Sequence, residues 1–174
     1  MKRHCSVYIV DGRAIVLSMH VSQAGSGLEW EPVRRVDNVS DAEALGQAIL
    51  AAMADSKENV AQPSAEEWKL WRRRFLKMIG AKSERAVASV TQLMNIWSDG
   101  DEVFIARERP ARDGRGFEPA QEPPTRLGSA TAAVIGTAVQ GVLSRPTEVE
   151  TGGCSAATGK NMGQLLKRKD APCL

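Results

Sequence analysis

The chain has 174 residues, of which 43% are hydrophobic and 25% charged, and its formal net charge is +2. These proportions are typical of a soluble globular protein that is long enough to bury a substantial core. The near balance of 23 basic and 21 acidic residues lacks the strong positive charge that would by itself indicate binding to nucleic acid or to an anionic membrane.

The amino-terminal segment and the cysteines indicate the compartment. The first apolar stretch, Val7 to Val10, is ended by Asp11 and is too short for a signal peptide. No other apolar run approaches the roughly 20 residues of a membrane span. Three scattered cysteines, without a CxxC motif and with only two histidines, predict neither a disulfide framework nor a zinc site. We expect a cytoplasmic protein without metal or cofactor.

Strand-like segments come first in the chain. Residues 5–10 and 14–21 are rich in β-branched residues and are separated by Asp11-Gly12, which predicts a hairpin. Residues 28–36 predict a third strand, which is interrupted by a proline.

Two helices follow, each preceded by a capping-box pattern. Ser40 with Glu43 predicts the start of the first helix, and Ser64 with Glu67 predicts the start of the second. The second helix contains WKLWRRRFLK, in which aromatic residues spaced three and four apart share one face while basic residues occupy the remainder. This spacing favours a core-facing aromatic stripe over a platform for stacking nucleic-acid bases. Gly80 predicts the helix end.

In the second half of the chain the predicted strands and helices are less clearly separated. Residues 82–88 are ambiguous, whereas 89–97 and 102–106 predict another hairpin around Ser98-Asp99-Gly100-Asp101. Residues 107–126 read as a loop rich in proline, glycine and arginine, with a short edge strand at 116–118. A last helix is expected to begin at a cap on Ser129. The segment from Pro146 onward, which includes Cys154 and Cys173, is polar and predicts a disordered tail.

The first and last predicted helices resemble each other. LGQAILAAM at 45–53 aligns without a gap with IGTAVQGVL at 135–143, so that Gly46 matches Gly136. Either a repeat or a chance likeness of two small-residue helices explains the match. In both cases the small residues would allow close packing of a helix on a sheet.

Motifs for catalysis are lacking: the sequence has no GxSxG, P-loop, GxGxxG or HExxH. His20 and Cys5 are more consistent with core or core-edge positions than with a general base or a nucleophile. Asp99 and Asp101 lie in a predicted turn, where such residues are common for conformational reasons. We therefore expect a protein that is not an enzyme.

Together these elements predict a single α/β (α+β) domain over residues 1–145 and a tail over 146–174. A mostly antiparallel or mixed central sheet is expected to carry about three helices, two of them possible repeats of one another.

The order of these pieces resembles the immunity proteins of bacterial contact-dependent growth inhibition systems, over roughly residues 5–145. The best-matching features are Gly46 in LGQAIL, the helix end Ala54-Asp55-Ser56-Lys57, Lys82-Ser83 and Gly116-Phe117. The sequence departs from the family after Lys82-Ser83, where Glu84-Arg85 stands in place of an aromatic residue.

The resemblance implies a cytoplasmic protein that binds the C-terminal toxin domain of a cognate effector and neutralises it, with a nuclease as the common kind of toxin. The toxin would be a protein partner, and neither a membrane nor nucleic acid would be bound directly. Family members have no catalytic residues to transfer, and their toxin contacts vary with the toxin. A small nucleic-acid-binding or other protein-interaction module, using Arg72–Arg74 and the 107–115 segment, is the alternative.

Two surfaces are candidates for partner binding. The first is Glu29-Trp30-Glu31, where two carboxylates flank an aromatic residue, although Trp30 could equally be a buried strand residue. The second is the arginine-rich segment, which is either a solvated loop or a docking surface. Its arginines are Arg107, Arg109, Arg112 and Arg115.

Overall fold

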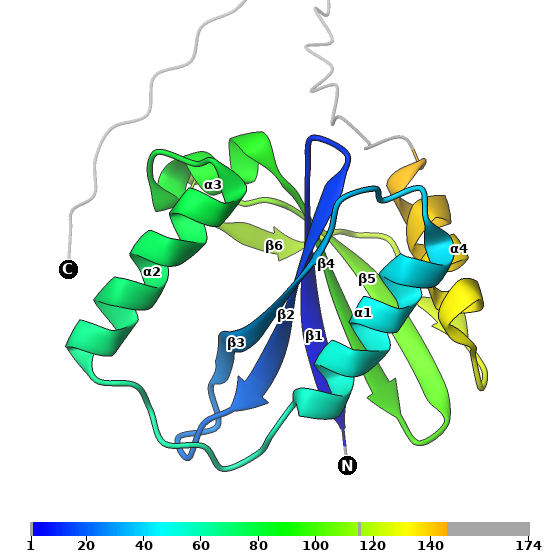
Figure 1. Cartoon of the computed structure of the whole chain (residues 1–174), viewed down its shortest axis with the longest axis horizontal. Helices are drawn as coiled ribbons and strands as arrows, with labels where there is room; N and C mark the ends of the chain where they lie inside the picture. Colours follow the sequence, from blue (N-terminus) through cyan, green and yellow to red (C-terminus); the bar gives the residue numbers. More distant parts are fainter. Residues whose placement is uncertain (1, 115, 146–174) are drawn as a thin grey trace, which may run out of the picture.

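The computed structural model describes residues 2–114 and 116–145. The predicted tail at 146–174, with Cys154 and Cys173, lies outside the described residues. The protein has an α+β fold built on an open seven-stranded sheet with the strand order β3-β2-β1-β4-β5-β6, in which β7 also pairs with β5 (Figure 1). The strands are β1 (Arg3–Val10), β2 (Arg13–Val21), β3 (Gly27–Val36), β4 (Gln92–Asp99), β5 (Glu102–Pro110), β6 (Phe117–Pro119) and β7 (Thr125–Leu127).

Every strand pair is antiparallel, so the mixed pairing that the sequence allowed does not occur among the named strands. Both predicted hairpins are confirmed. Asp11 and Gly12 have φ angles of 48° and 73° in the first turn, and Gly100 has a φ of 60° in the second. Positive φ at both central residues suits the right-handed twist of the flanking strands, which explains the Asp-Gly sequence at the first turn.

Three longer helices and one short helix cover the sheet. They are α1 (Ala42–Asp55), α2 (Ala65–Ile79), α3 (Glu84–Val90) and α4 (Ala132–Leu143). The capping box at Ser64 and Glu67 is confirmed, as is the left-handed Gly80 at the end of α2. The other two predicted caps are wrong by one or two residues: Asp41 rather than Ser40 accepts from the Ala44 amide, and Thr131 rather than Ser129 precedes α4.

Two further predictions are corrected. Residues 84–90 form α3, so β4 begins at Gln92 and not at residue 89. The 107–126 segment is not wholly a loop, because β5 continues to Pro110 and β7 covers 125–127. The short edge strand predicted at 116–118 is confirmed as β6 at Phe117–Pro119. The short strand β7 is formed by pairing with β5 rather than by an apolar pattern of its own, which is why the sequence did not indicate it.

The two faces of the sheet form separate cores. Alternate residues of β1 and β2 point to opposite sides, so that Val7 and Val16 pack with α1 and α4 while Tyr8 and Leu17 pack with α2 and α3. Figure 1 shows α1 and α4 side by side, away from α2. The aromatic face of α2 is turned inward with Trp71 buried, and Arg72, Arg73 and Arg74 are exposed, as the spacing predicted.

The paired glycines of α1 and α4 meet where these helices cross. A Cβ atom on Gly46 would lie 1.8 Å from the carbonyl oxygen of Ala132, and one on Gly136 would lie 1.8 Å from that of Ala42. The two contacts are reciprocal, which accounts for the matching positions of the two sequences. The expectation that these glycines serve packing against the sheet is therefore corrected: each one admits the backbone of the other helix.

Candidate functional site

The first predicted surface, Glu29-Trp30-Glu31, lies on β3 at one end of the sheet order. Trp30 is half-buried and stacks on Trp68 of α2, with ring centroids 5.9 Å apart and an interplanar angle of 7°. Its centroid is also 5.3 Å from that of Trp71. Trp30 thus belongs to the aromatic core on this face, which favours the reading of a packed strand residue.

The two carboxylates that flank Trp30 have different surroundings. Glu31 is exposed and forms an ion pair with Arg74 at 3.3 Å. Glu29 is half-buried and accepts hydrogen bonds from the hydroxyl of Tyr8, at 2.8 Å to one carboxylate oxygen and 3.0 Å to the other. Of the two, only Glu29 lies inside the protein beside aromatic rings, so the pair does not form one continuous acidic patch.

Burial changes the acid–base properties of the Tyr8–Glu29 pair. Removal from water raises the pKa of Glu29, and the hydrogen bonds from Ser6 and Tyr8 offset only part of this effect. The pKa of Tyr8 is raised by its burial and by the neighbouring Glu29 charge. Removing the Glu29 carboxylate from water costs free energy, and its hydrogen bonds offset only part of that cost.

A cavity of about 200 Å³ opens beside this pair and is called the aromatic pocket below. Tyr8, Trp71 and Phe75 are among its walls, and the edge-to-face contact between Tyr8 and Phe75 has a centroid separation of 4.9 Å. Its full lining is Tyr8, Glu29, Trp68, Trp71, Arg72, Phe75, Leu76, Glu84, Val87, Gly116 and Phe117.

An ion pair between α2 and α3 lies at the same pocket. Arg72 bonds to Glu84, and both side chains remain about half exposed at 46% and 51%. The guanidinium carbon of Arg72 lies 5.8 Å from the centroid of the Trp68 ring, within the range of a cation–π contact. The pocket therefore already holds one guanidinium between an aromatic ring and a carboxylate.

The second predicted surface, the arginine-rich segment, is partly folded into the sheet. Arg107 donates to the carbonyl oxygen of Arg145 at 2.9 Å, and Arg109 forms an ion pair with Glu118 at 2.9 Å. Arg112 is exposed, and Arg115 lies outside the described residues. Gly116 and Phe117, at the end of this 107–118 segment, line the aromatic pocket together with Glu29, whereas none of the described arginines of the segment does.

The sequence indicated the aromatic face of α2 that lines this pocket, but not the contribution of Tyr8. Tyr8 is the single tyrosine of the chain, yet in the sequence it is one more residue of a β-rich run. The alternation of side chains along the strand places Tyr8 on the face of the sheet opposite to Val7, as in the structure, but it does not say what lies on that face. Its pairing with Glu29 depends on the β1–β2–β3 order, which only the tertiary structure supplies.

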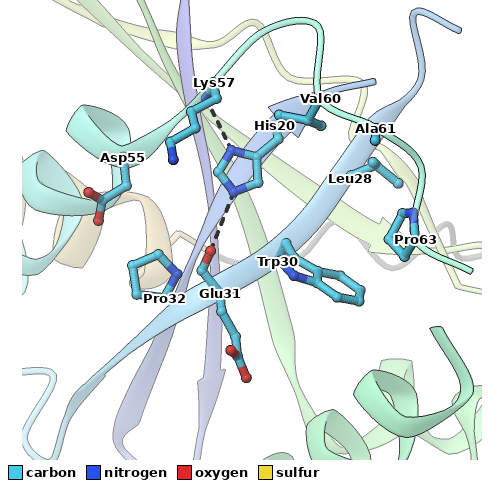
Figure 2. A pocket seen from close by; sticks show the side chains of 10 residues that line it. All are labelled: His20, Leu28, Trp30, Glu31, Pro32, Asp55, Lys57, Val60, Ala61 and Pro63. Carbon is cyan, nitrogen blue, oxygen red and sulfur yellow. Dashed lines mark hydrogen bonds between the residues drawn. The ribbon is translucent and has the colours of Figure 1, made fainter. Parts of the chain in front are cut away.

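A second cavity, of about 300 Å³, lies between β3 and the segment that follows α1 (Figure 2). His20 is buried here, and both of its ring nitrogens are engaged. Nδ1 accepts from the Lys57 amide at 3.0 Å, and Nε2 lies 3.4 Å from the Glu31 carbonyl oxygen. Because the ring is held by backbone partners on both sides, this histidine ties β2 to β3 and to the segment after α1.

A third cavity, of about 370 Å³, adjoins β4 and β5 and contains Glu108 and Trp97. The Asn95 amide donates to Glu108 at 2.8 Å, while burial raises the pKa of this carboxylate. Trp97 stacks on Phe104 with a centroid distance of 5.4 Å. This cavity shares no lining residue with the aromatic pocket, so Trp97 lies apart from the tryptophans of that pocket.

The described residues contain no group of three histidine, cysteine, aspartate or glutamate side chains placed to hold a metal ion. Cys5 is fully buried, and burial raises the pKa of its thiol, as expected for a small core residue. Among the described helices, none combines the length and the apolar character that crossing a membrane would demand.

Comparisons with known proteins identify the fold. No family model matches the chain, and no curated protein sequence matches it either. A protein of unknown function from Neisseria meningitidis superposes with a TM-score of 0.68 at 18% identity, covering 83% of this chain and 94% of its own. A chain of the CdiA-CT/CdiI toxin and immunity complex from Yersinia pseudotuberculosis superposes with a TM-score of 0.67 at 14% identity, covering 83% and 97%. At these identities the shared property is the fold.

Proposed function

We propose that this protein is an immunity protein that binds the C-terminal toxin domain of a cognate contact-dependent growth inhibition effector and neutralises it in the cytoplasm. It acts by binding and is not an enzyme. The toxin is expected to be a nuclease.

The observation that carries this proposal is the fold similarity to a chain of a toxin and immunity complex, over nearly the whole of that chain. The sequence resemblance to immunity proteins, which rests on separate features such as LGQAIL and Gly116-Phe117, supports the same function. The composition of the site also suits binding: the aromatic pocket and its rim combine rings with charged groups, which is typical of interface anchors.

Electrostatics argue for a protein partner rather than nucleic acid. Of the three consecutive arginines on α2, Arg72 is paired with Glu84 and Arg74 with Glu31. Arg109 is likewise paired with Glu118. Since acidic partners offset these charges, the two segments on which nucleic-acid binding would rely do not form one strong positive field.

The test is to co-express the protein with the C-terminal domain of the effector encoded beside it. A stable complex on size-exclusion chromatography, together with restored growth of cells that produce the toxin domain, is the expected result. A specific interface of this kind would bury roughly 800 Å² on each partner. Absence of a complex combined with unrelieved killing would reject the proposal. Binding to nucleic acid that weakens steeply with salt would instead favour the alternative module.

A further inference from the structure

We infer that the aromatic pocket is a binding site for a single arginine side chain of the partner protein, with Glu29 as the residue that accepts its charge. This inference rests on the proposed function for the identity of the partner. The site itself is argued from the pocket alone.

The size of the pocket limits the ligand. A volume of about 200 Å³ is smaller than the roughly 300 to 1,000 Å³ of sites that hold cofactors and other drug-sized molecules. One long side chain fits this space better than a whole small molecule does.

The walls of the pocket select a flat cation. Trp68, Trp71, Phe75 and Phe117 supply aromatic surfaces, against which a planar guanidinium can stack while its N–H groups point to a carboxylate. The chain's own Arg72 already makes this combination of contacts at the pocket, with Trp68 and Glu84. The same chemistry is therefore available to a second guanidinium that enters more deeply.

The charge at Glu29 supplies the driving force. Within the described part of the chain, Glu29 is hydrogen-bonded by Tyr8 and has no ion pair with a basic side chain. Burial disfavours the negative charge of this carboxylate and raises its pKa. A bound guanidinium would compensate this charge where water is partly excluded, and such charge-assisted, bidentate pairs are among the stronger hydrogen bonds.

The first experiment uses a probe that does not require the toxin. The full-length protein is titrated with N-acetyl-arginine N-methylamide while the four tryptophan indole N–H resonances are followed by NMR. We expect saturable shifts at Trp68 and Trp71 and none at Trp97, which lies at the separate cavity beside β5. The neutral analogue N-acetyl-citrulline N-methylamide has nearly the same shape and should produce no comparable shift.

Two variants assign the effect to Glu29. Glu29→Gln keeps the size of the side chain and an acceptor for the Tyr8 hydroxyl, and it should abolish the response to the arginine probe. Glu66→Gln removes an exposed carboxylate from the first turn of α2 and should leave the response unchanged. Thermal unfolding of both variants checks that they fold. An equal response to the citrulline probe, or a response that survives Glu29→Gln, would overturn the inference.

A second measurement connects the pocket to the partner. Glu29→Gln should weaken binding of the cognate toxin domain by at least about tenfold, since a buried charge pair would be lost, whereas Glu66→Gln should not. If the toxin binds the wild type and Glu29→Gln equally well, the toxin does not use the pocket and the inference fails while the proposed function stands. If the arginine probe binds and the toxin does not, the proposed function fails and the site remains.

Discussion

The two faces of the sheet are packed in different ways. On the face covered by α1 and α4 a large apolar cluster fills the space between helices and sheet, and the helices approach so closely that Gly46 and Gly136 have no room for a Cβ atom. On the face covered by α2 and α3, aromatic rings line an open cavity of about 200 Å³ that also has a carboxylate in its lining.

Under the proposed function, the first face contributes stability and the second contributes recognition of the partner. A closely packed apolar cluster stabilises the fold because it removes apolar surface from water and leaves few voids. The opposite face gives up part of that stabilisation, since it leaves space unfilled and holds Glu29 partly out of water. Binding sites are commonly less stable than the rest of a protein for this reason.

The largest expected effect concerns the helix crossing. Gly46→Ala or Gly136→Ala should lower the free energy of unfolding by about 3 kcal/mol or more, because the added Cβ meets backbone atoms that cannot move alone. Gly141→Ala is the matched control on α4, where a Cβ has open space. It should stabilise the helix by up to about 1 kcal/mol. Urea denaturation measures all three, and equal effects at Gly46 and Gly141 would contradict the close crossing.

The next prediction tests whether the α1/α4 face is more tightly packed than the α2/α3 face. Val139→Ile adds one methylene group to the fully buried α4 position and should cost about 1 to 3 kcal/mol. Val87→Ile adds the same group beside the aromatic pocket and should change stability by less than about 0.5 kcal/mol, because the cavity can accept it. The midpoints of urea denaturation measure both changes. Equal losses of stability for the two substitutions would contradict a difference in packing between the two faces.

A smaller effect is expected from the charge of Glu29. Its pKa in the folded state lies above the ordinary value of 4.5, so between these two values the folded protein binds more protons than the unfolded chain. Stability should therefore fall as pH rises through this interval.

Glu29→Gln removes the Glu29 contribution to that fall and should make the protein more stable than the wild type at neutral pH. Thermal unfolding at a series of pH values measures the difference, with Glu66→Gln as the control that keeps the wild-type slope. Glu108 also has a raised pKa, so part of the slope should persist in Glu29→Gln. A variant less stable than the wild type at neutral pH would show that Glu29 stabilises the free protein.

The smallest effect is expected at the rim of the pocket. Arg72→Ala breaks the ion pair with Glu84, yet both side chains are about half exposed and such pairs contribute roughly 0 to 1 kcal/mol. The change should therefore be small in urea denaturation and should diminish further with added salt. Arg73→Ala, at an exposed position of the same helix, provides the baseline. A loss far above this range would mean that α2 and α3 depend on the pair for their position.

Local chemistry in the sequence determined much of the secondary structure. Asp11-Gly12 adopts the positive φ angles that a two-residue hairpin requires, and Ser64 with Glu67 satisfies the first amides of α2. The three-and-four spacing of aromatic residues set the inward face of α2. These features depend on residues close in sequence, so they can be read without knowledge of the fold.

Tertiary structure alone decided the remainder. The strand β7 exists because β5 offers it hydrogen-bonding partners, and the short helix α3 lies in a segment whose sequence was ambiguous. The contact of Gly46 with Ala132 joins two helices distant in the chain, although the sequence likeness had matched their glycines. The aromatic pocket brings Tyr8, Glu29 and Phe117 together from three separate strands. A pattern within one element specifies which face is buried, but the partner on that face depends on long-range strand order and helix placement.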